Sequence, residues 1–103
     1  MVSNRRKMQA SNCKARHWLE SMGYRDITIF PHARFSKDLN LNSLKFDGIA
    51  IDNNSIAFFQ VKSNCKPTKD TQASMKEFHE KYRCLALWFD CIDGGEVDVY
   101  GSN

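Results

Sequence analysis

Two apolar runs separated by four polar residues constrain the fold of this chain most strongly. Residues 45–51 and 56–63 carry branched and aromatic side chains at strand-like spacing, and the sequence between them is Asp-Asn-Asn-Ser. Asparagine tolerates positive φ angles, so Asn53 and Asn54 suit the central positions of a tight turn. We therefore expect an antiparallel hairpin made of strands 45–51 and 56–63.

The register of this hairpin brings three polar residues together at its open end. Asp47 is expected directly opposite Gln60, with Cβ atoms roughly 5 Å apart, while Lys62 shares the face of Gln60. Carboxylate, carbonyl-type oxygen and ammonium groups in one place can hold a divalent cation and act on a phosphodiester. An alternative interpretation is purely structural, with Asp47 flanking an exposed strand end, Gln60 bonded to a neighbour and Lys62 reaching solvent.

Outside the hairpin, the pattern predicts two amphipathic helices, three further strands and one long polar loop. The helices are expected over residues 4–22, which Gly23 ends, and over residues 71–83. The strands are expected at 25–33, 84–92 and 96–100, and the loop at 34–44. The expected order is α-β-β-β-α-β-β, which describes an α/β fold with a small mixed β-sheet flanked by helices.

Length and composition indicate one small globular domain inside a cell. A chain of 103 residues can bury a single modest core, so residues 1–103 are treated as one domain. No apolar run approaches the ~20 residues of a membrane span, and the charged start lacks the apolar segment of a secretory signal. The four cysteines lack the close spacing of zinc or redox motifs, which favours mostly buried, reduced thiols in a cytoplasmic protein.

A net charge of +3 is mild, so any argument for a nucleic acid partner depends on where the basic residues lie. One cluster comprises Arg5, Arg6, Lys7, Lys14 and Arg16 in the first helix, and another comprises Lys62 at the end of the hairpin and Lys66 and Lys69 after it. Such clusters can neutralise phosphates and make DNA binding depend on salt. A solvated surface without a partner explains either cluster equally well.

The hairpin also carries a resemblance to a known family. Asp47, followed after twelve residues by Gln60-Val61-Lys62, resembles the signature of the PD-(D/E)XK nucleases, in which an Asp begins one strand and a (D/E)-x-K triplet lies on the next. The spacing is similar to that of Holliday-junction resolvase-like and virus-type replication-repair nucleases. The element order resembles their restriction-endonuclease-like core, and Gln72 matches a Gln that such proteins often carry at the start of the following helix.

The resemblance implies a metal-dependent endonuclease that hydrolyses DNA with one or two Mg²⁺ ions, for which Mn²⁺ can substitute. Asp47 would be the principal metal ligand, Gln60 a further ligand and the Val61 carbonyl a third. Lys62 would orient the attacking water or stabilise the developing charge. Gln72 would help to position Lys62 or the substrate.

Two positions depart from the family pattern. Gln60 is neutral where the family usually has Asp or Glu, and Asn12 stands where the family usually has a Glu on the first helix. An amide oxygen can coordinate Mg²⁺, but it offsets the desolvation of the cation less well than a carboxylate does. The alternative function is therefore a catalytically degenerate nuclease fold that binds nucleic acid, or a protein partner, without cutting.

Residues around the hairpin are expected to contact the DNA backbone. These candidates are Ser36, Lys37, Lys66, Lys69, Gln72, Arg5 and Arg6. A domain this small has little surface with which to read base sequence. We therefore expect structure-selective cutting, or cutting by a homodimer or larger homo-oligomer, and no membrane partner. A phage or mobile-element origin would suit the small size.

Overall fold

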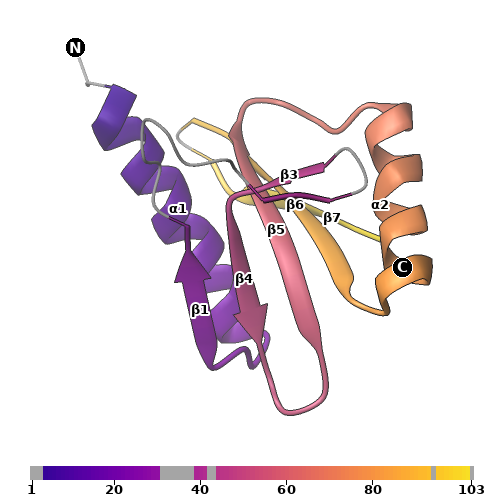
Figure 1. Ribbon diagram of the computed structural model, residues 1–103. Coiled ribbons are helices and arrows are strands. Elements are labelled where there is room, and N and C mark those ends of the chain that lie inside the picture. Colours follow the sequence, from indigo (N-terminus) through magenta and orange to yellow (C-terminus); the bar gives the residue numbers. More distant parts are fainter. Residues whose placement is uncertain (1–3, 31–38, 42–43, 94, 103) are drawn as a thin grey trace.

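The computed structural model describes residues 4–30, 39–41, 44–93 and 95–102, with side chains from residue 13 onward except in 39–41 (Figure 1). The helices are α1 (Asn4–Ser21) and α2 (Lys69–Tyr82), and the strands are β1 (Asp26–Ile29), β2 (Leu39–Leu41), β3 (Leu44–Phe46), β4 (Gly48–Ile51), β5 (Ile56–Ser63), β6 (Leu85–Cys91) and β7 (Val97–Gly101). The expected α/β class with a mixed sheet and flanking helices is confirmed.

Helix α1 ends at Ser21, just before the glycine that the sequence pattern indicates as its stop. Gly23 adopts a φ of 95°, which an L side chain rarely tolerates. This conformation lets the Gly23 N–H donate to the Glu20 carbonyl and the Tyr24 N–H donate to the Leu19 carbonyl, both at 3.1 Å. These are the bonds of a Schellman motif, and they turn the chain sharply toward β1.

Five strands form one mixed sheet in the order β1-β4-β5-β6-β7. The pairs β1·β4, β4·β5 and β6·β7 are antiparallel, whereas β5 and β6 are parallel. Helix α2 supplies the long crossover that a parallel pair requires. The sheet therefore has β5 at its centre, with the candidate residues Gln60 and Lys62 on that central strand.

Two apolar clusters bury the two faces of this sheet. On one face, Ala15 and Leu19 of α1 pack against a group that includes Phe59 and Phe89, and on the other, Met75 and Phe78 of α2 pack against a group that includes Phe58. The two helices consequently cover opposite faces (Figure 1). Each fully buried phenylalanine contributes about 1.5–3 kcal/mol by leaving water.

The expected continuous strand over residues 45–51 is wrong. The chain is interrupted at Asp47, and the segment before it, β3, pairs with β2 in a separate antiparallel ribbon. Strand β2 falls inside the segment expected to be a polar loop. Leu44 and Phe46 of β3 are buried in the α2 cluster, and this long-range packing pulls the segment out of the main sheet.

The turn between β4 and β5 lies where expected, but its conformation differs. Among the described residues other than glycine, only Asn64 and Arg83 have positive φ angles, so Asn53 and Asn54 do not use the left-handed region. The Asp52 carboxylate instead accepts bonds from the N–H groups of Asn54 and Ser55, each at 2.7 Å. The turn is therefore stabilised by an aspartate side chain at its first position.

Two further expectations can be compared with the structure. The first strand is shorter than residues 25–33, because β1 ends at Ile29 and Pro31 lies outside the described residues. The four cysteines all lie in the described part, and none forms a disulfide bond, but only Cys91 is buried, so the expectation of mostly buried thiols is wrong. Neither helix in the described ranges has the length and apolar composition needed to cross a bilayer.

Candidate functional site

Asp47 lies at the point where the chain leaves the β4–β5 ladder. Its N–H donates to the Phe59 carbonyl at 2.8 Å, although Gly48 is the residue that pairs with Phe59. Two residues thus oppose one, as in a β-bulge, which re-aims the side chain. The expectation that Asp47 lies directly opposite Gln60 is therefore wrong, because the bulge shifts Asp47 by one residue.

The bulge aims the Asp47 carboxylate at the neighbouring strand. Its Oδ2 accepts a hydrogen bond of 2.7 Å from the Val61 N–H. Val61 is the middle residue of the Gln60-Val61-Lys62 triplet, so the carboxylate binds the triplet directly. The expected association of Asp47 with this triplet therefore exists, but a side-chain bond creates it and a strand register does not.

Gly48 and Phe59 hold this arrangement in place. A Cβ atom on Gly48 would collide with the Phe59 ring and would lie 2.5 Å from the Thr28 carbonyl oxygen of β1. Only glycine fits between the ring and this backbone. The close approach keeps Asp47 tight against β5.

Gln60 is a buried polar residue on the α2 face, with only 5% of its surface exposed. No group of the described residues makes a hydrogen bond to its amide. In the described part, every fully enclosed side-chain nitrogen or oxygen atom has a partner, so the small exposed fraction of Gln60 belongs to the amide itself. The unbonded amide of this buried side chain therefore reaches the surface and is available to a ligand.

Lys62 shares the face of Gln60, as expected, but differs from it in burial. The alternation along β5 places both residues on the same side of the strand, and Lys62 is exposed. No carboxylate oxygen of the described residues lies within ion-pair distance of its ammonium group. Lys62 thus presents an exposed positive charge on the same face as the buried amide.

The donor set around Asp47 fits a hard divalent cation in chemical type. Within one strand residue the N–H and C=O point toward the same neighbouring strand, so the Val61 carbonyl faces the Asp47 side, beyond the end of β4. A carboxylate, an amide oxygen and a main-chain carbonyl are ligands that Mg²⁺ and Mn²⁺ accept. Among the described residues, no three His, Cys, Asp or Glu side chains cluster as a metal site. The proposed ligand set differs from such a cluster, because only one of its three ligands is a carboxylate.

The segment after β5 folds back toward β6 and α2. Asn64 has a φ of 52°, and its N–H donates to the Cys91 carbonyl at 3.0 Å. Helix α2 then begins with Thr68 as N-cap, whose hydroxyl oxygen accepts a bond from the Thr71 N–H. The segment between β5 and α2 therefore lies against the end of β6.

Three of the expected substrate contacts lie in this segment. Lys66 lies in the connecting loop and Lys69 in the first turn of α2, and both are exposed. Gln72 is exposed as well, and its amide nitrogen donates to the Pro67 carbonyl at 3.2 Å. Lys66, Lys69 and Gln72 therefore lie on the exposed segment that follows Lys62 in the chain, and Gln72 holds the loop through Pro67.

The remaining expected contacts lie outside the described part of the structure. Ser36 and Lys37 lie outside the described residues, as do the side chains of Arg5, Arg6 and Asn12.

Sequence reasoning also missed a residue that the structure brings close to the site. Asp90 of β6 is buried on the α2 face in register with Lys62, and its one sequence signal is an aspartate inside the apolar run CLALWFDCI.

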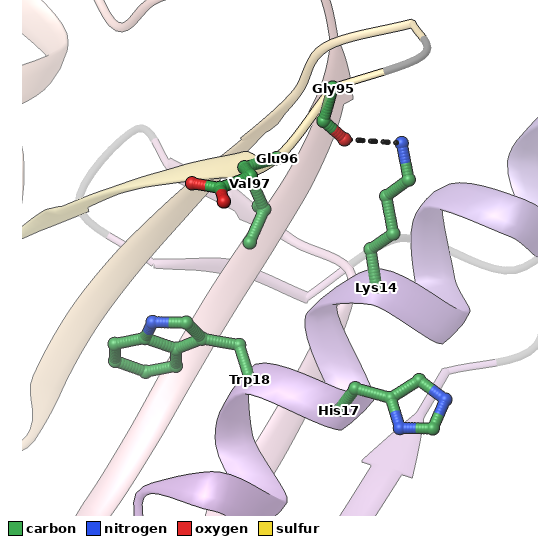
Figure 2. Close-up of a pocket in the computed structure, with 6 residues that line it drawn as sticks. All are labelled: Lys14, His17, Trp18, Gly95, Glu96 and Val97. Carbon is green, nitrogen blue, oxygen red and sulfur yellow. Dashed lines mark hydrogen bonds between the residues drawn. The ribbon is translucent and has the colours of Figure 1, made fainter.

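A second feature is a hollow of about 540 Å³ between α1 and the β6–β7 turn (Figure 2). Lys14 donates across it to the carbonyls of Ile92 and Gly95, at 3.1 and 3.3 Å, while the His17 ring points away from it. Its Trp18 packs edge-on against Phe89. The hollow therefore lies on the α1 face, on the opposite side of the sheet from Gln60, and its lysine serves to hold a turn.

Comparisons with known proteins returned no match, whether with protein-family models, with curated proteins or with solved structures.

Proposed function

We propose that this protein is a metal-dependent endonuclease that hydrolyses DNA phosphodiester bonds. The observation that carries the proposal is the 2.7 Å bond from the Val61 N–H to the Asp47 carboxylate. It joins two sequence elements fourteen positions apart into one cluster with an acid, a buried amide and a lysine. Such a cluster at the end of a central strand, with a basic loop beside it, suits phosphodiester chemistry.

Each residue of the cluster has a distinct task in this proposal. Asp47, the Gln60 amide and the Val61 carbonyl would hold Mg²⁺ or Mn²⁺, which when bound polarises the phosphate and lowers the pKa of a bound water. The exposed Lys62 ammonium group orients the attacking water or stabilises the charge that develops on the phosphate oxygens. The burial of Gln60 limits access of bulk water and strengthens these electrostatic interactions.

The surroundings of the cluster support a polyanionic substrate. Lys66 and Lys69 are exposed on the segment that follows Lys62, and Gln72 holds that segment through Pro67. Ser36, Lys37, Arg5 and Arg6 remain part of the proposed contact surface. Backbone contacts of this kind position DNA without reading its sequence, so the proposal favours structure-selective cutting or cutting by a homo-oligomer.

The test is a cleavage assay on labelled plasmid, duplex, single-stranded and four-way-junction DNA in Mg²⁺ or Mn²⁺. Wild type is compared with Asp47→Ala and Lys62→Ala. Metal-dependent products that both variants lose are the expected result. Folded wild-type protein that cuts none of the substrates in either metal would contradict the proposal.

One observation favours a second function, a nuclease fold that binds nucleic acid without cutting. The buried residue at the first position of the triplet, where the family signature has Asp or Glu, is the neutral Gln60, so the site has one negative charge fewer than a carboxylate there would provide. Under this alternative the protein binds DNA in a salt-dependent manner and forms no metal-dependent product. The same assay, with binding measured in parallel at two salt concentrations, separates the two functions.

A further inference from the structure

Asp90 is the most deeply buried carboxylate among the described residues, with 3% of its surface exposed. Its Oδ1 accepts a bond of 2.9 Å from the Cys65 N–H, and the Trp88 indole donates to the Cys65 carbonyl at 2.8 Å. No group of the described residues makes a hydrogen bond to Oδ2. Since no enclosed side-chain oxygen of the described part lacks a partner, this second oxygen reaches the surface.

The sheet register places Asp90 beside the candidate site. On the parallel strands β5 and β6, Lys62 pairs with Asp90 and Gln60 pairs with Trp88. Paired residues share a face, so Asp90 lies diagonally across from Gln60, roughly 8 Å away between Cα atoms. Two buried polar side chains on adjacent strands, each with an unbonded polar atom reaching solvent, thus flank Lys62.

We propose that Asp90 is a second carboxylate of the site and supplies the negative charge that Gln60 lacks. This inference rests on the proposed function, because it concerns the same cation. Without Asp90, the charges of Asp47 and Lys62 would cancel, leaving the cation to be balanced by neutral oxygens. With Asp90 the cluster carries a net negative charge, which a divalent cation requires in a partly buried setting.

The test is calorimetric titration of the full chain with Mn²⁺, which reads the site without any DNA or turnover. Asp90→Asn retains the shape and an oxygen for the Cys65 N–H but removes the charge, so it should weaken Mn²⁺ binding about tenfold. Asp98→Asn is the matched control, because Asp98 pairs with Asp90 one strand further from Gln60 and is exposed. Its affinity should stay within about twofold of wild type.

A structural role of Asp90 makes different predictions. If Asp90 serves only to hold Cys65, then Trp88→Phe, which removes the other bond to Cys65, should weaken Mn²⁺ binding as much as Asp90→Asn does. If Asp90 supplies charge, Gln60→Glu should restore Mn²⁺ affinity in the Asp90→Asn background. The double variant should bind Mn²⁺ about as tightly as wild type and more weakly than Gln60→Glu alone. If Asp90→Asn alone does not fold, the comparison of the double variant with Gln60→Glu still tests the role of Asp90.

The outcomes distinguish the two proposals. Wild-type binding of Mn²⁺ with unchanged affinity in Asp90→Asn would overturn the role of Asp90 and leave the proposed nuclease site standing. The role of Asp90 would also be overturned if the double variant bound Mn²⁺ as tightly as Gln60→Glu alone. Absence of Mn²⁺ binding by folded wild type would overturn both proposals.

Discussion

The Asp47 carboxylate accepts a hydrogen bond of 2.7 Å from the Val61 N–H. Asp47 directly precedes β4, so its side chain takes the position that a main-chain carbonyl of a longer β4 would occupy. A side chain therefore completes the hydrogen bonding of the central strand. Because this carboxylate is also the acid of the candidate site, one residue carries a structural and a proposed chemical task. Substitutions at Asp47 can separate the two.

Asp47→Asn and Asp47→Ala should differ in stability but not in activity. Asparagine keeps an oxygen for the Val61 N–H, whereas alanine leaves this half-buried N–H without its partner, which costs about 1–2 kcal/mol in the free energy of unfolding. Both variants lose the carboxylate and should lose metal-dependent cleavage. Urea denaturation and the DNA cleavage assay measure the two effects, and an alanine variant as stable as wild type would contradict the structural role.

Lys62→Ala should abolish cleavage without a loss of stability. Lys62 is exposed and makes no ion pair with the described residues, so its removal should change the free energy of unfolding by less than about 0.5 kcal/mol. The matched control is Lys76→Ala, which removes an exposed lysine from α2. Retained cleavage in Lys62→Ala, or equal loss in the control, would refute a specific role for Lys62.

Gln60→Leu should stabilise the protein while weakening metal binding. The change replaces a buried amide that no described residue bonds with an apolar side chain of similar size, which should raise the free energy of unfolding by about 1 kcal/mol. Opposite changes in stability and function are typical of a residue retained for its chemistry. Urea denaturation and Mn²⁺ calorimetry test this, with Gln60→Glu expected to bind Mn²⁺ more tightly than wild type. A destabilised Gln60→Leu would indicate that the amide has a structural partner.

Gly48→Ala should destabilise the hairpin and disturb the site together. The added Cβ would meet the Phe59 ring and the Thr28 carbonyl, an overlap that should cost about 1–3 kcal/mol. Gly95→Ala is the control, because its Cβ would meet the exposed Ile92 side chain at 3.3 Å and the Ile92 carbonyl oxygen at an ordinary contact distance of 3.7 Å. Thermal unfolding should show a large decrease in melting temperature for the first variant and little change for the second. Equal melting temperatures would mean that the Phe59 ring and the Thr28 carbonyl can move away from position 48 at no cost.

The turn at Asp52 should make stability depend on acidity. The N–H groups of Asn54 and Ser55 lower the pKa of Asp52 below its ordinary value of 3.8 because they stabilise the ionised form. A carboxylate whose pKa is lower in the folded state stabilises the protein fully above about pH 4, and this stabilisation is lost as the pH falls through the folded pKa.

The measurement is the difference in melting temperature between wild type and Asp52→Asn as a function of pH. The difference should be constant from pH 7 to 5 and should shrink below pH 4. Asn53→Ala alters the same turn without removing a carboxylate, so its difference from wild type should show no such change. A difference for Asp52→Asn that is independent of pH would show that the charge of Asp52 is not involved.

Local sequence pattern determined much of the architecture. The short link between two apolar runs makes them pair with each other, and the register of Ile49 with Phe58 and of Ile51 with Ile56 follows from it. The helical spacing of Met75 and Phe78 likewise predicts α2 and the face that it buries. These features depend on residues close in the chain, so the sequence alone was sufficient.

The details of the candidate site were decided by contacts between distant segments. Leu44 and Phe46 of β3 are buried against the residues of α2, and this packing interrupts the strand at Asp47 and replaces the expected pairing with Gln60 by a bond to Val61. The burial of Asp90 depends on Cys65 folding back over β6. No local pattern encodes these contacts, because burial and side-chain direction are set only when segments far apart in sequence pack together.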